Sequence, residues 1–112
     1  MGQIVGYVTS HEAQAFAIYA ESVGLDVSAL ANLLIRREMR LGRLNQMPVP
    51  PVEERSVKIT AHLKGEQIKT SFTVHAKRHG LRAGPAATRL YRAELEEHWL
   101  ATCLAVNLFD ST

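Results

Sequence analysis

Residues 10–44 of this chain recur in similar form 56 positions later, and this repeat constrains the fold more than any other feature. A shift of 56 residues aligns nine identical pairs: Phe16/Phe72, Ala20/Ala76, Gly24/Gly80, Leu25/Leu81, Ala31/Ala87, Leu34/Leu90, Arg36/Arg92, Glu38/Glu94 and Leu44/Leu100. Most of these residue types set helix packing or a turn, so a shared fold explains the identities better than shared composition. The sequence therefore predicts two copies of one structural unit.

Each copy is expected to begin with a strand. Residues 57–63 alternate between apolar and polar side chains, which is the period of a strand with one buried face. Residues 3–8 show a weaker form of the same alternation. A single short strand is not stable alone, because its backbone groups and its apolar face both need a partner. Antiparallel pairing of the two strands satisfies both needs.

Two helices should follow each strand. Thr9 and Glu12 form a capping-box pattern, so the first helix should begin near residue 10. Gly24 supplies a left-handed end to that helix. Asp26 is a good N-cap for the next helix, which should run to about Leu41. The apolar sides of these two helices are predicted to contain Phe16, Tyr19, Ala20, Val23, Leu30, Leu33 and Leu34.

The second unit follows the same plan and closes with a longer helix. Pro85 fits the first turn of that helix, where backbone N–H groups lack intrahelical partners, and the helix should continue through Trp99. We predict a first unit at residues 1–44, a Pro-rich linker at 45–56, and a second unit with a C-terminal helical extension at 57–112. The predicted fold is mainly α with a two-stranded antiparallel β-ribbon, in the order β-α-α-β-α-α, and the two units form one compact domain.

Each unit has the order strand, amphipathic helix, Gly-Leu turn and a helix that opens with small residues. This order resembles the ribbon-helix-helix (Arc/MetJ-like) superfamily. Its usual members are homodimers that pair one strand from each chain. This chain holds both copies, so the resemblance implies a single-chain pseudo-dimer over about residues 3–100. It also implies a DNA-binding protein whose ribbon enters the major groove of double-stranded DNA.

The resemblance assigns roles to particular residues. Ribbon side chains that point outward would contact bases, and the start of the second helix in each unit would contact phosphates. The implied base-contacting residues are Lys58, Thr60, His62, Gln3, Val5 and Tyr7. The implied phosphate-contacting residues are Val27, Ser28, Arg82, Ala83 and Gly84. The chemistry suits the second strand well, since Lys58 can donate to guanine O6 or N7 and Thr60 to several base edges.

The direction in which the first strand faces remains open from the sequence. The 56-residue shift aligns Gln3, Val5 and Tyr7 with the apolar positions of the second strand. A strict repeat would therefore turn Ile4 and Gly6 outward instead. A slip of one residue reverses every side chain of a strand, so either arrangement fits the pattern.

The composition of the chain excludes several classes of protein. The net charge of +2 is too small to indicate a nucleic-acid partner alone, but residues 57–100 carry eight Lys and Arg against four Glu. The chain has no run of about 18 apolar residues, so a cytoplasmic protein without a membrane span is expected. Its lone Cys103 excludes an intrachain disulfide, and no cofactor or metal is expected. Nothing in it matches a phosphate loop, a nucleophile elbow or paired catalytic carboxylates, so an enzyme is not expected.

Three functional interpretations survive. The first is sequence-specific DNA binding, as a transcriptional repressor or as an accessory factor in plasmid or conjugative DNA transfer. Tandem units and the Arg-Arg-Glu segment at 36–38 are similar to proteins of mobile elements that help a relaxase, which suggests a relaxase or other transfer protein as a further partner. The second is an antitoxin-like protein, and the third is a protein-interaction module with degenerate DNA binding. DNA binding should depend strongly on salt, whereas docking through Val5 and Tyr7 should not.

Several local features have simpler explanations. His75 and His79 are spaced i, i+4 and could hold a metal, but a packing role is favoured because His75 aligns with Tyr19. Cys103 stands in an apolar setting that favours an inert thiol. The arginine run Arg36, Arg37, Arg40 and Arg43 is expected to be a solvated helix face. The protein is expected as a monomeric pseudo-dimer or a higher oligomer on DNA, and the linker would also permit strand swapping between chains.

Overall fold

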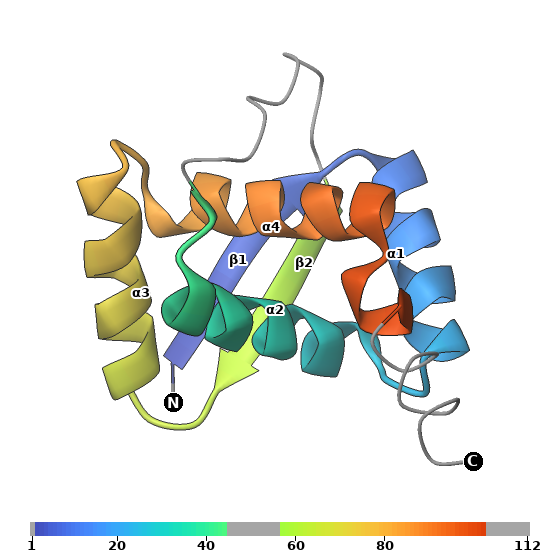
Figure 1. The fold of residues 1–112 in the computed structure, drawn as a ribbon, viewed down its shortest axis with the longest axis horizontal. Coiled ribbons are helices and arrows are strands. Elements are labelled where there is room, and N and C mark those ends of the chain that lie inside the picture. The colour runs from blue at the N-terminus through green and yellow to red at the C-terminus, as the bar shows by residue number, and fades with distance from the viewer. Residues whose placement is uncertain (1, 45–56, 103–112) are drawn as a thin grey trace.

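Figure 1 shows the computed structural model of the chain, which describes residues 2–44 and 57–102. The elements are β1 (Gly2–Val8), α1 (Ser10–Ser22), α2 (Val27–Leu41), β2 (Val57–Leu63), α3 (Gln67–Arg78) and α4 (Ala83–Glu97). The mainly helical fold with a two-stranded antiparallel sheet is the predicted one. The predicted linker, Cys103 and the rest of the predicted C-terminal extension lie outside the described residues.

The ribbon forms by antiparallel pairing of the two strands along their full length. Its register runs from Gly2 opposite Leu63 to Val8 opposite Val57. In both strands buried and more exposed residues alternate, so one face of the ribbon is covered and the other is open. The view in Figure 1 is from the covered side: α2 and α4 cross that face of the ribbon, and α1 and α3 stand at opposite ends.

The helix ends follow the local signals in the sequence. Thr9 caps α1, and its side chain and that of Glu12 form the predicted capping box. Gly24 takes the left-handed conformation at φ 80°, and the Leu25 N–H then donates to the carbonyl of Ala20 at 2.9 Å. The side chain of Asp26 accepts from Ala29 N at 2.7 Å, so α2 begins where predicted.

A single hydrophobic core draws residues from all six elements. Phe16, Tyr19 and Ala20 of α1 are buried in it, as predicted from their spacing. The ring of Phe16 packs against that of Tyr91 in α4 with centroids 5.2 Å apart. Each unit therefore buries its apolar faces against the other, which explains why the two copies occur together.

The end of α4 differs from the prediction that this helix continues through Trp99. The helix ends at Glu97 because His98 adopts a left-handed conformation at φ 49°, and helical backbone resumes at 99–102. The Glu94 carboxylate stabilises this break by accepting from Leu100 N at 2.8 Å. The helical pattern in the sequence continues across the break, so it did not indicate this interaction.

The facing of the first strand is resolved by contacts between the helices and the strands. Asn32 donates to the carbonyl of His62 at 3.2 Å, and Thr88 donates to the carbonyl of Tyr7 at 3.0 Å. Asn32 and Thr88 are 56 positions apart, but Tyr7 and His62 are only 55 apart. The strands are thus one residue out of step with the helices, and Gly6 faces inward rather than outward.

Gly6 leaves space that α4 fills. A Cβ atom at this position would lie 2.8 Å from Cε2 of Tyr91 and 3.0 Å from the backbone N of Thr88. We expect Gly6→Val to lower the free energy of unfolding by about 1–3 kcal/mol, because the added atoms must displace α4. Urea denaturation followed by circular dichroism measures this change.

Gln3→Val is the matched control, since Gln3 lies on the open face of the same strand. It should change the free energy of unfolding by less than about 0.5 kcal/mol. Equal stability of the Gly6→Val variant and the unmodified protein would contradict the inward placement of Gly6.

Candidate nucleic-acid interface

The open face of the ribbon carries all six residues that were predicted to contact bases. The register places them opposite one another in three cross-strand pairs: Gln3 with His62, Val5 with Thr60, and Tyr7 with Lys58. The two outer pairs are exposed, and the central pair is partly buried. The structure therefore brings together, on one surface, residues that are more than 50 positions apart in the sequence.

The three pairs differ in chemistry along the ribbon. Nε2 of Gln3 lies 3.3 Å from Nδ1 of His62, which joins a side-chain amide and an imidazole at one end. At the other end Lys58 lies opposite Tyr7, which is 47% exposed. These groups offer hydrogen-bond donors at both ends, and the central pair offers methyl groups that can pack on thymine.

The first turns of α2 and α4 border the ribbon, one beside each strand. Oγ of Ser28 accepts from the backbone N of His62 at 3.3 Å, so the start of α2 lies against β2. Gly84 approaches β1 so closely that a Cβ there would lie 2.8 Å from the carbonyl oxygen of Val5. Val27 and Ala83, the first residues of these helices, are partly buried. The predicted phosphate-contacting positions thus flank the predicted base-contacting face.

The two helix starts are electrostatically different. At α2 the Asp26 carboxylate already accepts from a backbone N–H of the first turn. At α4 the N-cap is Arg82, whose side chain makes no capping hydrogen bond. A helix start favours an anion because its N–H groups and dipole are positive. The α4 start, with a cation in place of a carboxylate, is therefore the more favourable of the two for an anion.

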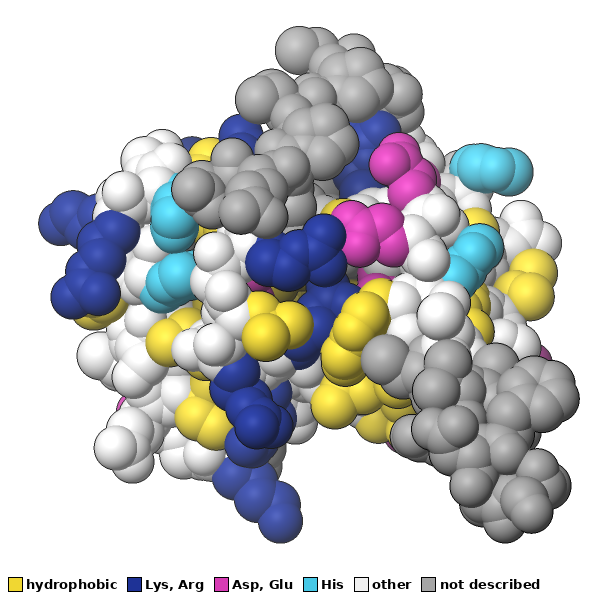
Figure 2. Space-filling model, in the orientation of Figure 1, with side chains coloured by type: hydrophobic (Ala, Val, Ile, Leu, Met, Phe, Trp, Pro, Cys, Tyr) yellow, Lys and Arg dark blue, Asp and Glu magenta, His cyan; other side chains and the backbone are white. Residues whose placement is uncertain are grey.

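The α2 helix crosses the covered face of the ribbon and carries Arg36, Arg37 and Arg40 of the arginine run, and Arg43 follows its end. Figure 2 views this side and shows Lys and Arg side chains beside exposed apolar ones. Arg36 and Arg40 are exposed, as predicted. For Arg37 the prediction of a solvated position is wrong: its side chain is 5% exposed and bonds the Glu94 carboxylate at 2.9 Å. The ring of Trp99 lies over the Arg37 guanidinium, and the distance from the ring centroid to Cζ of Arg37 is 4.5 Å.

Glu38 and Glu94 are buried, and the repeat gives them equivalent partners. Oη of Tyr19 donates to Oε2 of Glu94 at 2.6 Å, and Nε2 of His75 lies 2.7 Å from Oε2 of Glu38. Tyr19 and His75 are 56 positions apart, as are the two glutamates. Burial and the hydrogen bond to Glu94 raise the pKa of Tyr19 to about 12. Sequence reasoning missed these polar contacts, although the Glu38/Glu94 identity was a signal for them.

His75 and His79 both make contacts within the protein. Their ring centroids lie 4.8 Å apart, and His75 is held by Glu38. Within residues 2–44 and 57–102, no group of three His, Cys, Asp or Glu side chains is arranged to hold a metal ion. Two histidines without a third ligand make a poor zinc site.

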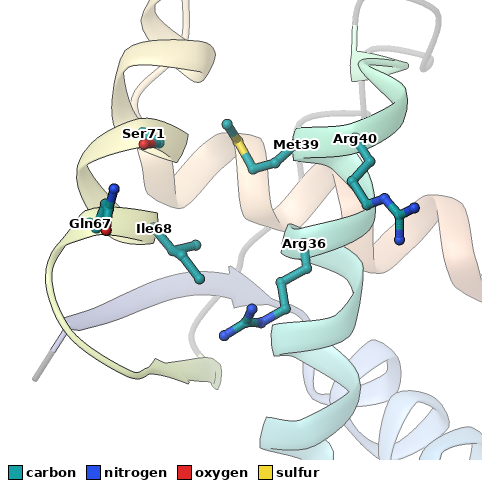
Figure 3. A pocket seen from close by; sticks show the side chains of 6 residues that line it. All are labelled: Arg36, Met39, Arg40, Gln67, Ile68 and Ser71. Atoms are coloured by element: carbon teal, nitrogen blue, oxygen red, sulfur yellow. The ribbon is translucent and has the colours of Figure 1, made fainter.

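Two hollows border the exposed part of α2. One, of about 340 Å³, lies between α2 and α3 and is lined by Arg36, Met39, Arg40, Gln67, Ile68 and Ser71. Figure 3 shows that Met39 extends toward α3 across this hollow and that Arg40 points away from it. The second, of about 410 Å³, is lined by Leu33, Arg36, Arg37, Arg40, Leu41 and Trp99. Neither hollow includes a residue of the ribbon.

No single helix within residues 2–44 and 57–102 is long and apolar enough to cross a membrane. Taken together, α1 and α2 have the length and apolar composition of a span, but they are bent by 88° relative to each other. Comparisons with protein-family models, with curated proteins and with solved structures gave no match.

Proposed function

We propose that this chain is a single-chain ribbon-helix-helix protein that binds double-stranded DNA through the open face of its β-ribbon. The observation that supports this most strongly is the shared face of Lys58, Thr60 and His62 with Gln3, Val5 and Tyr7. A surface built from two distant segments is unlike the accidental solvent side of one hairpin, because helices from both units hold it in place.

The shape and chemistry of this face fit the major groove. The groove is about 12 Å wide and admits a two-stranded ribbon, whose outward side chains then meet base edges. Lys58 reads guanine in this arrangement, and the central Val5 and Thr60 methyl groups contact thymine. The starts of α2 and α4 reach the phosphates on either side, which sets the register of the protein on the duplex.

The two halves of the interface are not equivalent. Only the β2 strand carries a cation on the open face, and only the α4 start has an arginine at its N-cap. A homodimer must present identical halves, whereas this chain can prefer a DNA site without twofold symmetry. A role as a transcriptional repressor or as an accessory factor at a transfer origin, with a relaxase as partner, is compatible with such a site.

Salt dependence tests whether DNA is the partner. The proposal predicts that the logarithm of the association constant for a random-sequence duplex falls linearly with the logarithm of the salt concentration. The slope should be about −0.9 for each phosphate that the protein neutralises. Fluorescence anisotropy with a labelled duplex gives this slope. A protein-interaction module or an antitoxin-like protein that had lost DNA binding would show no duplex binding even at low salt.

The helix starts supply a more specific prediction. Arg82→Gln should weaken binding on all duplexes and reduce the magnitude of the salt slope by about 1, because one phosphate contact is lost. Asp26→Asn keeps a good N-cap residue but removes a negative charge beside the α2 phosphate site. It should therefore raise affinity by about two- to fivefold at low salt. Opposite signs for the two variants support the assignment, and no change in either contradicts it.

A further inference from the structure

The outer faces of α1 and α3 carry matching stripes of exposed side chains. On α1 the stripe consists of His11, Gln14, Ile18 and Glu21, and on α3 it consists of Gln67, Thr70, Val74 and Lys77. Each member of the second stripe lies 56 positions after its counterpart. The spacing of three and four residues places each set on one side of its helix.

An aliphatic side chain is exposed at the same place in both stripes. Ile18 is 63% exposed and Val74 is 45% exposed. A single exposed aliphatic residue is ordinary on a protein surface and needs no explanation. Here, however, both copies of the repeat expose a β-branched aliphatic residue at equivalent positions, although the neighbouring residues differ. This recurrence indicates that both positions face a common environment.

The charges around the two stripes are opposite. Residues 10–26 contain Glu12, Glu21 and Asp26 and no Lys or Arg. Residues 64–82 contain Lys64, Lys69, Lys77, Arg78 and Arg82 against the single acid Glu66. Glu12 is paired with Arg92 at 2.7 Å, so Glu21 and Asp26 supply the exposed acidic charge at the α1 end. Glu21 and Lys77 occupy the same stripe position with reversed sign.

We propose that copies of this chain associate head to tail, with the α1 stripe of one copy against the α3 stripe of the next. The helices that carry the two stripes, α1 and α3, lie at opposite ends of the long axis of the molecule (Figure 1), so a contact between unlike ends leaves one free stripe on each outer copy. Such a heterologous contact adds copies in a row rather than closing as a dimer. Contact between two like ends would bring charges of the same sign together.

The contact is small, and this sets how it must be measured. One helix face per copy buries less than the roughly 800 Å² per partner of a stable complex, so association in free solution is weak. Opposite charges make it strongest at low ionic strength. Sedimentation velocity of the full chain at low salt, over concentrations up to about 1 mM, is the appropriate measurement. It uses no DNA and is independent of the proposed function.

Polar substitutions at the two stripes separate head-to-tail contact from other kinds. Ile18→Gln and Val74→Gln each remove one apolar contact from an exposed position and keep all charges, so the fold is preserved. Each should weaken self-association at least about fivefold, and added salt should weaken it further. Leu41→Gln, at a site on α2 that is 55% exposed, is the matched control and should associate like the unmodified protein.

A mixture of the two variants gives the decisive result. Ile18→Gln keeps an intact α3 stripe and Val74→Gln keeps an intact α1 stripe, so an equimolar mixture should form a dimer and stop there. Each variant alone should remain mostly monomeric. The proposal is overturned if the unmodified protein stays monomeric at all concentrations, if only one of the two substitutions weakens association, or if the mixture forms no dimer.

Discussion

Replacing Glu94 with alanine is expected to lower the free energy of unfolding by about 3–5 kcal/mol. The Glu94 side chain is fully buried, and its carboxylate pairs with Arg37 at 2.9 Å. It also accepts hydrogen bonds from Tyr19 and from Leu100 N. Without it, the Arg37 charge stays buried with no counter-ion and the turn after α4 loses its acceptor. The effect is large because the removed carboxylate leaves several buried groups unsatisfied.

Glu97→Ala is the matched control for this prediction. Glu97 and Arg43 also join α4 to the segment after α2, at 3.2 Å, but their side chains are 39% and 36% exposed. An exposed ion pair contributes at most about 1 kcal/mol, so this variant should unfold almost like the unmodified protein. Urea denaturation of both variants measures the difference. Similar losses in the two variants would contradict the role assigned to the buried network.

Replacing Thr60 with glutamate should reduce affinity for any duplex at least about 100-fold at low salt. Thr60 and Val5 form the central pair of the open ribbon face. In the proposed complex this pair lies deepest in the major groove, where a carboxylate meets the phosphate field and must lose its water. The substitution is on the solvent side of the strand, so the fold should remain intact.

Thr60→Gln provides a control of the same shape without the charge. It should cost much less affinity than Thr60→Glu, and the difference between the two variants should shrink as salt is raised. Circular dichroism spectra of both variants should match that of the unmodified protein. Equal binding by the Glu and Gln variants at low salt would place the ribbon outside the DNA contact.

Much of the fold could be predicted because its signals are local. The capping box at Thr9, the N-cap at Asp26 and the left-handed Gly24 fixed helix ends with nearby residues only. The repeat gives each unit a single strand without a partner of its own, so the antiparallel pairing of the two strands could be predicted. The order of elements and the pairing of β1 with β2 followed from these observations without any tertiary information.

The features that could not be predicted depend on contacts between distant residues. The facing of β1 goes with its contacts to α4, where Thr88 donates to Tyr7 and Tyr91 lies close to Gly6, and the alternation in this strand was too weak to indicate it. Arg37 occupies a polar position in the helical pattern, yet it is buried because Glu94 reaches it from the other unit. Local periodicity reports burial against an apolar core and does not detect a buried ion pair.

The residues of the candidate site could also be predicted only in part. The alternation in β2 correctly separated Lys58, Thr60 and His62 from the buried residues of that strand. The difference between the two helix starts was visible in the sequence, because Asp26 is a predicted N-cap and Arg82 stands at the equivalent position of the second unit. The structure adds that the Asp26 carboxylate accepts a capping hydrogen bond and that the Arg82 side chain makes none.

The most direct test of the central claim is a comparison of DNA binding by two double variants across a salt series. Lys58→Ala/His62→Ala removes a lysine and a histidine from the open ribbon face, and Arg36→Ala/Arg40→Ala removes two exposed cations from α2, outside the ribbon and outside the α1 and α3 stripes. If the ribbon binds DNA, the first variant should lose binding to random-sequence and candidate operator or transfer-origin duplexes, while the second binds with nearly unchanged affinity and salt slope. Equal losses in both variants, or no duplex binding by the unmodified protein at low salt, would contradict the claim.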